Sequence, residues 1–182
     1  MRVERLRLPE VLLFTPRRFS DDRGWFAETY NQRVIDEAVG SVTRFVQDNH
    51  SRSAKDVLRG LHYQLPPHAQ AKLVRVVRGA IWDVAVDVRR SSPTFGEWVA
   101  AELTEENQAQ VWIPAGFAHG FLSLMDGTEV LYKTSDFWAP TAERSIRWDD
   151  PKLALPWPIS TQPQVAPKDA AAPQLADAEL FI

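Results

Sequence analysis

From residue 43 onward the chain is a succession of short runs in which apolar and polar residues alternate, and no other feature limits the fold as strongly. Alternation puts successive side chains on opposite faces of a strand. Turn-forming residues separate the runs at intervals of about ten residues, which favours an antiparallel sandwich or barrel over alternating strands and helices. The runs are TRFVQDNHS (43–51), KLVRVVRG (72–79), AIWDVAVDV (80–88), GEWVAAEL (96–103), AQVWIP (109–114), HGFLSL (119–124) and EVLYKTSDFW (129–138).

The first 40 residues predict two strands and a helix. A short strand is expected in VLLFTPRRF (11–19), followed by a turn at 20–24 and an alternating strand at 25–30. Asn31 can cap a helix through QRVIDEAV, and Gly40 can end it. We therefore expect a mainly β protein with one or few short helices.

The 182 residues are enough for one domain with a substantial core. We expect a single domain over 1–182, with the core barrel at about 43–138. The segment 149–182 is rich in proline and alanine, so a solvated tail is one reading. Leu153, Leu155, Trp157 and Ile159 indicate instead that its first part packs on the barrel.

Composition excludes several classes of function. The 21 basic and 24 acidic residues are mixed along the chain, so no polybasic field predicts binding to nucleic acid or to a membrane surface. A small anionic ligand remains open. The absence of cysteine excludes disulfides, thiolate catalysis and cysteine-ligated metals. No apolar run approaches the ~20 residues that span a bilayer, and a cytoplasmic protein is expected.

The stretch 59–79, RGLHYQLPPHAQAKLVRVVRG, places His62 ten residues before Lys72 on a β scaffold. A neutral imidazole has an ordinary pKa of ~6.5 and can remove a proton near neutral pH. An ammonium group nearby can stabilise an oxyanion. Alone, His62 would more often be a structural histidine; together the two groups indicate proton transfer beside a carbonyl. Tyr132 carries a phenol that can donate a proton, although strand tyrosines are commonly structural.

Two segments resemble the paired motifs of the cupin superfamily of small β-barrels. They are Gly60-Leu61-His62-Tyr63-Gln64 running on to Gly79, and Pro114-Ala115-Gly116-Phe117-Ala118-His119. Metal-binding cupins have a second histidine where this chain has Gln64, and an acid near the place of Lys72. A protonated lysine repels a cation and has no lone pair to donate. We therefore expect no metal and no cofactor, although a metal-dependent oxygenase using His62 and His119 remains an alternative.

An ordered set of segments covering nearly the whole chain resembles the dTDP-4-dehydrorhamnose 3,5-epimerase family. Each segment is weak separately, and their order makes the resemblance specific. They are DRGWFAE (22–28), FVQDNHS (45–51), LRGLHYQ (58–64), KLVRV (72–76), WDVAVD (82–87), IPAGFAHGF (113–121) and YK (132–133).

The resemblance implies a metal-free, cupin-type epimerase acting on a dTDP-linked 4-keto-6-deoxy sugar. His62 would be the base, assisted by Asp169; Tyr132 would be the acid on the opposite sugar face, and Lys72 would stabilise the enolate. The residues implied to bind substrate are Arg23 and Arg59 at the diphosphate, His119 at the sugar, and Phe26, Glu28, Gln47, Asn49 and Trp138 at the nucleotide.

The family is dimeric, with residues from N-terminal strands entering the neighbouring subunit's site, so a homodimer is expected. Arg23, Phe26 and Glu28 would then act in trans. Asp83 can either orient a histidine or serve only the structure.

Other functions remain open at this point. A mono-epimerase acting at carbon 3 or 5 would use nearly the same residues. A ketoisomerase of the same sugars would arrange its histidines differently, and a non-catalytic cupin that binds a nucleotide sugar would have no need of Tyr132 opposite His62.

Overall fold

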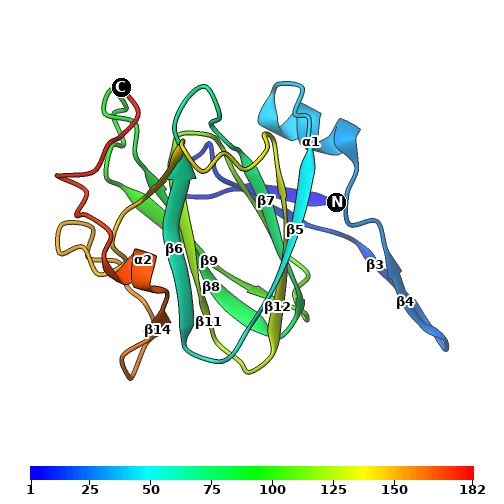
Figure 1. The fold of residues 1–182 in the computed structure, drawn as a ribbon. Coiled ribbons are helices and arrows are strands. Elements are labelled where there is room, and N and C mark those ends of the chain that lie inside the picture. Colours follow the sequence, from blue (N-terminus) through cyan, green and yellow to red (C-terminus); the bar gives the residue numbers. More distant parts are fainter.

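The computed structural model describes residues 1–182 and contains fourteen strands and two helices. Two antiparallel sheets face each other and enclose a barrel, as Figure 1 shows, so the predicted mainly β antiparallel fold is confirmed. The first sheet has the order β1 (Arg2–Arg5), β2 (Leu12–Thr15), β10 (Gln110–Ile113), β7 (Lys72–Arg78), β12 (Thr128–Thr134) and β5 (Gln47–Ser53). The second has the order β13 (Glu143–Ser145), β6 (Val57–Gln64), β11 (Phe117–Ser123), β8 (Ala80–Asp87) and β9 (Trp98–Thr104), with β14 (Gln164–Val165) parallel to β6.

Strand alternation divides the core into layers. Along β8, Ile81 and Ala85 belong to the cluster between the two sheets, together with Val76 and Val130 of the first sheet. Val84, Val86 and Trp82 alternate with them and belong to a second cluster, the outer cluster, which includes residues of the C-terminal segment. Because β8 is covered on both faces, its sequence is apolar almost throughout.

The C-terminal segment, 149–182, packs against the outer face of the second sheet, so the prediction of a solvated tail is wrong. Leu153, Trp157, Leu175 and Leu180 are buried in the outer cluster, although their spacing fits neither a strand nor a helix. The segment also contains the one-turn helix α2 (Pro167–Ala170). Figure 1 shows α2 beside β6, the strand that carries His62.

The N-terminal region agrees in part with prediction. Helix α1 (Gln32–Val39) begins after Asn31, whose side chain accepts from the Arg33 and Val34 amides, and ends at Gly40 in the left-handed conformation, as predicted. The single strand expected at 11–19 is in fact two, β2 and β3 (Arg18–Asp21), since Pro16 cannot donate to a sheet. Strand β1 was not predicted.

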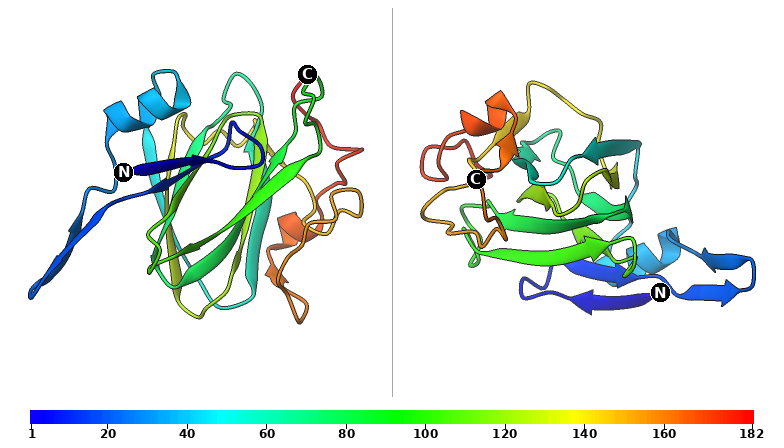
Figure 2. Two further views of the ribbon diagram at one scale, coloured as in Figure 1. Left: turned by 180° about the vertical axis from the view of Figure 1, so that it is seen from behind. Right: turned by 90° about the horizontal axis from the view of Figure 1, so that it is seen from below.

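A two-stranded hairpin projects from the barrel. Strand β3 pairs with β4 (Gly24–Ala27) and with no other strand. Figures 1 and 2 show the hairpin extending away from both sheets. Neither helix is long or apolar enough to cross a membrane.

Candidate active site

A histidine and an aspartate from distant parts of the chain form a pair at the wall of the barrel. His62 lies on β6, directly opposite His119 on β11. Helix α2 brings Asp169 to it, and the distance from Asp169 Oδ1 to His62 Nε2 is 2.6 Å. Burial alone would raise the pKa of Asp169, but the hydrogen bond to His62 and the charge of that ring hold the pKa below its ordinary value. The carboxylate is therefore ionised and can orient the imidazole.

The close approach of β6 and β11 requires glycine at position 60. A Cβ atom there would lie 2.6 Å from the Gly120 Cα and 2.6 Å from the His119 carbonyl oxygen, and the Gly60 φ of +119° disfavours other residues. The Gly60 amide donates to the second carboxylate oxygen of Asp169 at 3.2 Å. One glycine thus permits the strand packing and also fixes the carboxylate.

Lys72 begins β7 on the opposing sheet and is only 8 % exposed. Its Nζ donates to the His62 carbonyl oxygen at 3.3 Å. Burial lowers the pKa of Lys72 to about 8, against the opposing influence of Asp83 and Glu143. The residues predicted to be base and cation are therefore neighbours, and burial makes the ammonium group of Lys72 easier to deprotonate than an exposed one.

His119 lies deeper, with its Nε2 atom 2.8 Å from Asp83 Oδ2. Burial lowers the pKa of His119, although Asp83 opposes the change. Asp83 thus contacts a histidine, which was one of the two roles open to it. The neutral ring of His119 borders the same cavity as His62 and Lys72.

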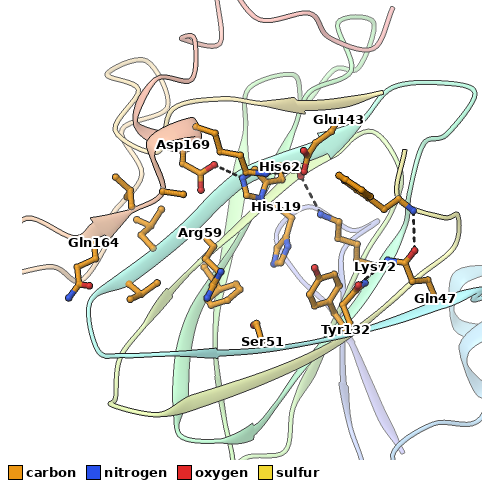
Figure 3. A pocket seen from close by; sticks show the side chains of 18 residues that line it. Gln47, Ser51, Arg59, His62, Lys72, His119, Tyr132, Glu143, Gln164 and Asp169 are labelled. Carbon is orange, nitrogen blue, oxygen red and sulfur yellow. Dashed lines mark hydrogen bonds and ion pairs between the residues drawn. The ribbon is translucent and has the colours of Figure 1, made fainter. Parts of the chain in front are cut away.

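These groups border a cavity of about 580 Å³ between the sheets, shown in Figure 3. Tyr132 projects into it from β12. Burial raises the pKa of Tyr132, partly offset by the charge of Arg59, so the phenol is protonated at neutral pH. The residues predicted to be base, cation and proton donor therefore border one space.

The residues expected to bind the nucleotide line the same cavity toward β5. Gln47 donates to Asn49 Oδ1 at 2.9 Å and accepts from the Trp138 amide at 3.0 Å. Arg59 Nε donates to Ser53 Oγ at 3.2 Å. The Trp138 ring is 58 % exposed, which leaves a face free for stacking.

Three predicted residues are not brought to this cavity. Arg23 and Phe26 lie on the projecting hairpin, with Glu28 just after it, and none of them lines the cavity. Phe26 is 69 % exposed, and the Arg23 guanidinium pairs with Asp21.

Several residues that the sequence did not predict also line the cavity, among them Ser51, Glu143 and Lys168. Ser51 follows Gln47 and Asn49 at the period of a strand, so alternation could have found it. Its hydroxyl is buried without a hydrogen-bond partner. Glu143 and Lys168 form an ion pair at 3.2 Å, and they lie on the short elements β13 and α2, where the sequence carries no comparable periodic signal.

Gln64, at the position of a metal-ligating histidine in other cupins, has a structural role. Its amide donates to the carbonyl oxygens of His68 and Phe137, and its oxygen accepts from the Ala139 amide. No group of three or more His, Asp or Glu side chains gathers as a metal site. Gln64 therefore joins the loop at His68 to the loop at 137–139.

The fold and the cavity define a cupin-like barrel protein with acid–base groups around a buried lysine. Residues 5–177 match the family model described as dTDP-4-dehydrorhamnose 3,5-epimerase. The chain belongs to this family, as the sequence resemblance predicted.

Individual relatives match nearly the whole chain. The dTDP-4-dehydrorhamnose 3,5-epimerase of Pseudomonas aeruginosa is 57 % identical over 181 residues, covering 100 % of this chain and 99 % of the relative. The crystal structure of a dTDP-6-deoxy-D-glucose-3,5-epimerase from Legionella pneumophila with dTDP-4-keto-L-rhamnose superposes with a TM-score of 0.93 at 47 % identity, covering 96 % and 93 % of the two chains. A dTDP-4-dehydrorhamnose 3-epimerase of Streptomyces niveus is 38 % identical, covering 98 % and 86 %.

Proposed function

We propose that this protein is an isomerase that inverts carbons 3 and 5 of a dTDP-linked 4-keto-6-deoxyhexose, in the biosynthesis of dTDP-rhamnose or a related deoxysugar. Family membership supports the substrate class and the reaction. The observation that carries the mechanism is the His62–Asp169 pair, at 2.6 Å, on the same cavity as the buried Lys72.

The first step is removal of a proton from a carbon beside the ketone. His62 takes the proton from carbon 3, the C–H electron pair becomes the carbon–carbon double bond of an enolate, and the carbonyl electrons move to the oxygen on carbon 4. Asp169 stabilises the imidazolium that forms. Lys72 stabilises the enolate oxygen, an interaction commonly worth about 2.7–4 kcal/mol in the transition state.

Inversion then requires a proton from the other face of the sugar. Tyr132 donates it to carbon 3, which restores the ketone and leaves a phenolate that is reprotonated as the imidazolium loses its proton. The same cycle at carbon 5 completes the double epimerisation. Neither cycle uses a metal or a cofactor.

The nucleotide would lie along β5, with Trp138 stacking on the base and Arg59 binding the diphosphate, since guanidinium groups suit phosphate oxygens. We also propose a homodimer in which the hairpin of one chain supplies Arg23, Phe26 and Glu28 to the other. The exposure of Phe26, 69 %, supports this arrangement because an aromatic ring in water gains from burial against a partner.

Single epimerisation at carbon 3 is the second candidate. The similarity of this chain to a relative that is named as a 3-epimerase supports this second candidate. The two candidates share the same base, acid and cation, and they differ in how many positions exchange.

The test is incubation with dTDP-4-keto-6-deoxyglucose in deuterated water, followed by NMR at carbons 3 and 5. We expect deuterium at both positions, and none with His62→Ala. Exchange at carbon 3 alone would identify a mono-epimerase, and no exchange would indicate a binding protein. Metal analysis of the purified protein accompanies the assay, because stoichiometric iron or zinc would contradict the mechanism.

A further inference from the structure

Asp169 reaches His62 from a segment with little regular structure of its own. Helix α2 contains four residues, and an isolated turn of that length is not stable in water. The position of the carboxylate therefore depends on what holds the chain on either side of α2. Upstream, β14 pairs with Val57 and Leu58 of β6.

Downstream, the chain is held by a buried aspartate outside the cavity. Asp150 is 1 % exposed, and its Oδ2 atom accepts from the Leu175 amide at 2.6 Å. Leu175 follows Asp169 by six residues. Nearby, the Arg147 amide donates to the Pro173 carbonyl oxygen at 2.9 Å, so two bonds fix the chain just after α2.

Asp150 is itself fixed by its own loop. Its Oδ1 atom accepts from the Lys152 amide at 2.7 Å and from the Leu153 amide at 3.4 Å. Both carboxylate oxygens thus bind backbone amides from two segments about 25 residues apart. Asparagine has the same shape as aspartate but cannot reproduce both sets of hydrogen bonds, because its side-chain amide has only one accepting oxygen.

We propose that Asp150 is a positioning residue for proton transfer: by holding Leu175, it sets the place of Asp169 and, through Asp169, the orientation of the His62 ring. This rests on the proposed function of His62. Catalytic groups must be held closely, and a misplacement of about 1 Å can lower a rate by about a hundredfold.

The test compares Asp150→Asn with Leu180→Ala, a matched control that destabilises the same C-terminal segment at a buried position beyond the Asp150 contact. For Asp150→Asn we expect deuterium exchange at carbon 3 to slow by roughly tenfold, with dTDP affinity little changed. The Gly60 amide resonance should shift, since that amide donates to Asp169. Leu180→Ala should lower Tm but leave the exchange rate and the resonance unchanged.

Asp150→Asn with a normal exchange rate and an unshifted Gly60 amide would overturn the proposal. So would equal loss of exchange in both variants at matched Tm, because that would make the effect one of stability alone. If the wild-type protein exchanges no deuterium, the proposed function fails, while the Gly60 resonance still decides whether Asp150 positions Asp169.

Discussion

The cavity and the hairpin differ in how far the side chains of each are covered by other residues of the same chain. In the cavity, His62, Asp169, Lys72 and Tyr132 all come from a single chain; Asp169 and Lys72 are buried, and the other two are half-buried. On the hairpin, Phe19, Trp25 and Phe26 are exposed. The difference teaches that the proposed proton-transfer groups are assembled by the folding of one chain, whereas the proposed role of the hairpin residues requires a partner chain.

The largest effect that tests this comparison is expected for Lys72→Met. Loss of the cation should lower kcat by about 10²–10³-fold, because the enolate oxygen loses its donor. The same change should raise the free energy of unfolding by roughly 1–4 kcal/mol, since a buried charge without a carboxylate partner is replaced by an apolar side chain. Denaturant titration and the NMR assay measure the two effects.

Lys133→Met is the matched control. Lys133 lies next to Tyr132 on β12 but pairs with Asp48 near the surface. It should leave kcat unchanged and stability nearly so. A Lys72→Met enzyme with normal kcat would show that the chemistry does not depend on the buried cation.

The next effect concerns the hairpin. Replacing Arg23, Phe26 and Glu28 together by alanine should raise KM by about 10–100-fold with a smaller change in kcat, because binding contacts are lost while the base remains. Co-refolding this variant with His62→Ala should restore about a quarter of wild-type activity, the share of sites with two intact halves in a randomly mixed twofold dimer.

The control for that experiment mixes His62→Ala with Lys72→Met. Both changes lie in the same chain's cavity, so no mixed site is intact and no activity should return. Failure of the hairpin mixture to recover activity would show that the hairpin does not complete a neighbouring site.

Part of the cavity was predictable from the sequence because His62, Lys72 and Tyr132 lie on strands. Period-two alternation placed Lys72 and Tyr132 on barrel walls, and Asn31 and Gly40 marked the ends of α1 correctly. The grouping of the expected catalytic residues around one cavity agrees with the family resemblance. That resemblance, and not the residue pattern, indicated Asp169.

The remainder could not be predicted because it depends on irregular contacts. The C-terminal segment packs through loops, so its apolar residues, such as Leu153 and Leu175, follow no period. Asp150 looks like a surface aspartate in a proline-containing turn until Leu175 is seen to donate to it. Composition likewise could not distinguish a packed segment from a tail.

A smaller effect is expected from pH. Burial lowers the pKa of Lys72 to about 8, so kcat should fall as the pH rises through that value and the ammonium is lost. Stability should change in the opposite direction. Between pH of about 8 and the ordinary lysine value of 10.5, the unfolded chain binds more protons at this residue than the folded chain, and stability rises with pH. The difference between wild type and Lys72→Met isolates both effects, and parallel pH profiles would contradict them.

The smallest effect is expected at Ser51, where the cavity meets the nucleotide contacts. Figure 3 shows Ser51 between Arg59 and Tyr132, and its buried hydroxyl has no partner. Ser53, two residues further along β5 and on the same face, accepts a hydrogen bond from Arg59 Nε. Because the Ser51 hydroxyl has no partner, it is free to donate to a phosphate oxygen beside the Arg59 guanidinium. Ser51→Ala should weaken dTDP binding by about 3–10-fold.

Calorimetry with thymidine, dTDP and a dTDP-sugar locates this contact, because each ligand adds one part to the last. Loss that begins with dTDP places the hydroxyl at the diphosphate, and loss only with the dTDP-sugar places it at the hexose. If Ser51→Ala binds each of the three ligands as tightly as the wild type does, Ser51 takes no part in binding. Stability of the unliganded protein should not fall, since the alanine removes a buried hydroxyl that has no partner to lose.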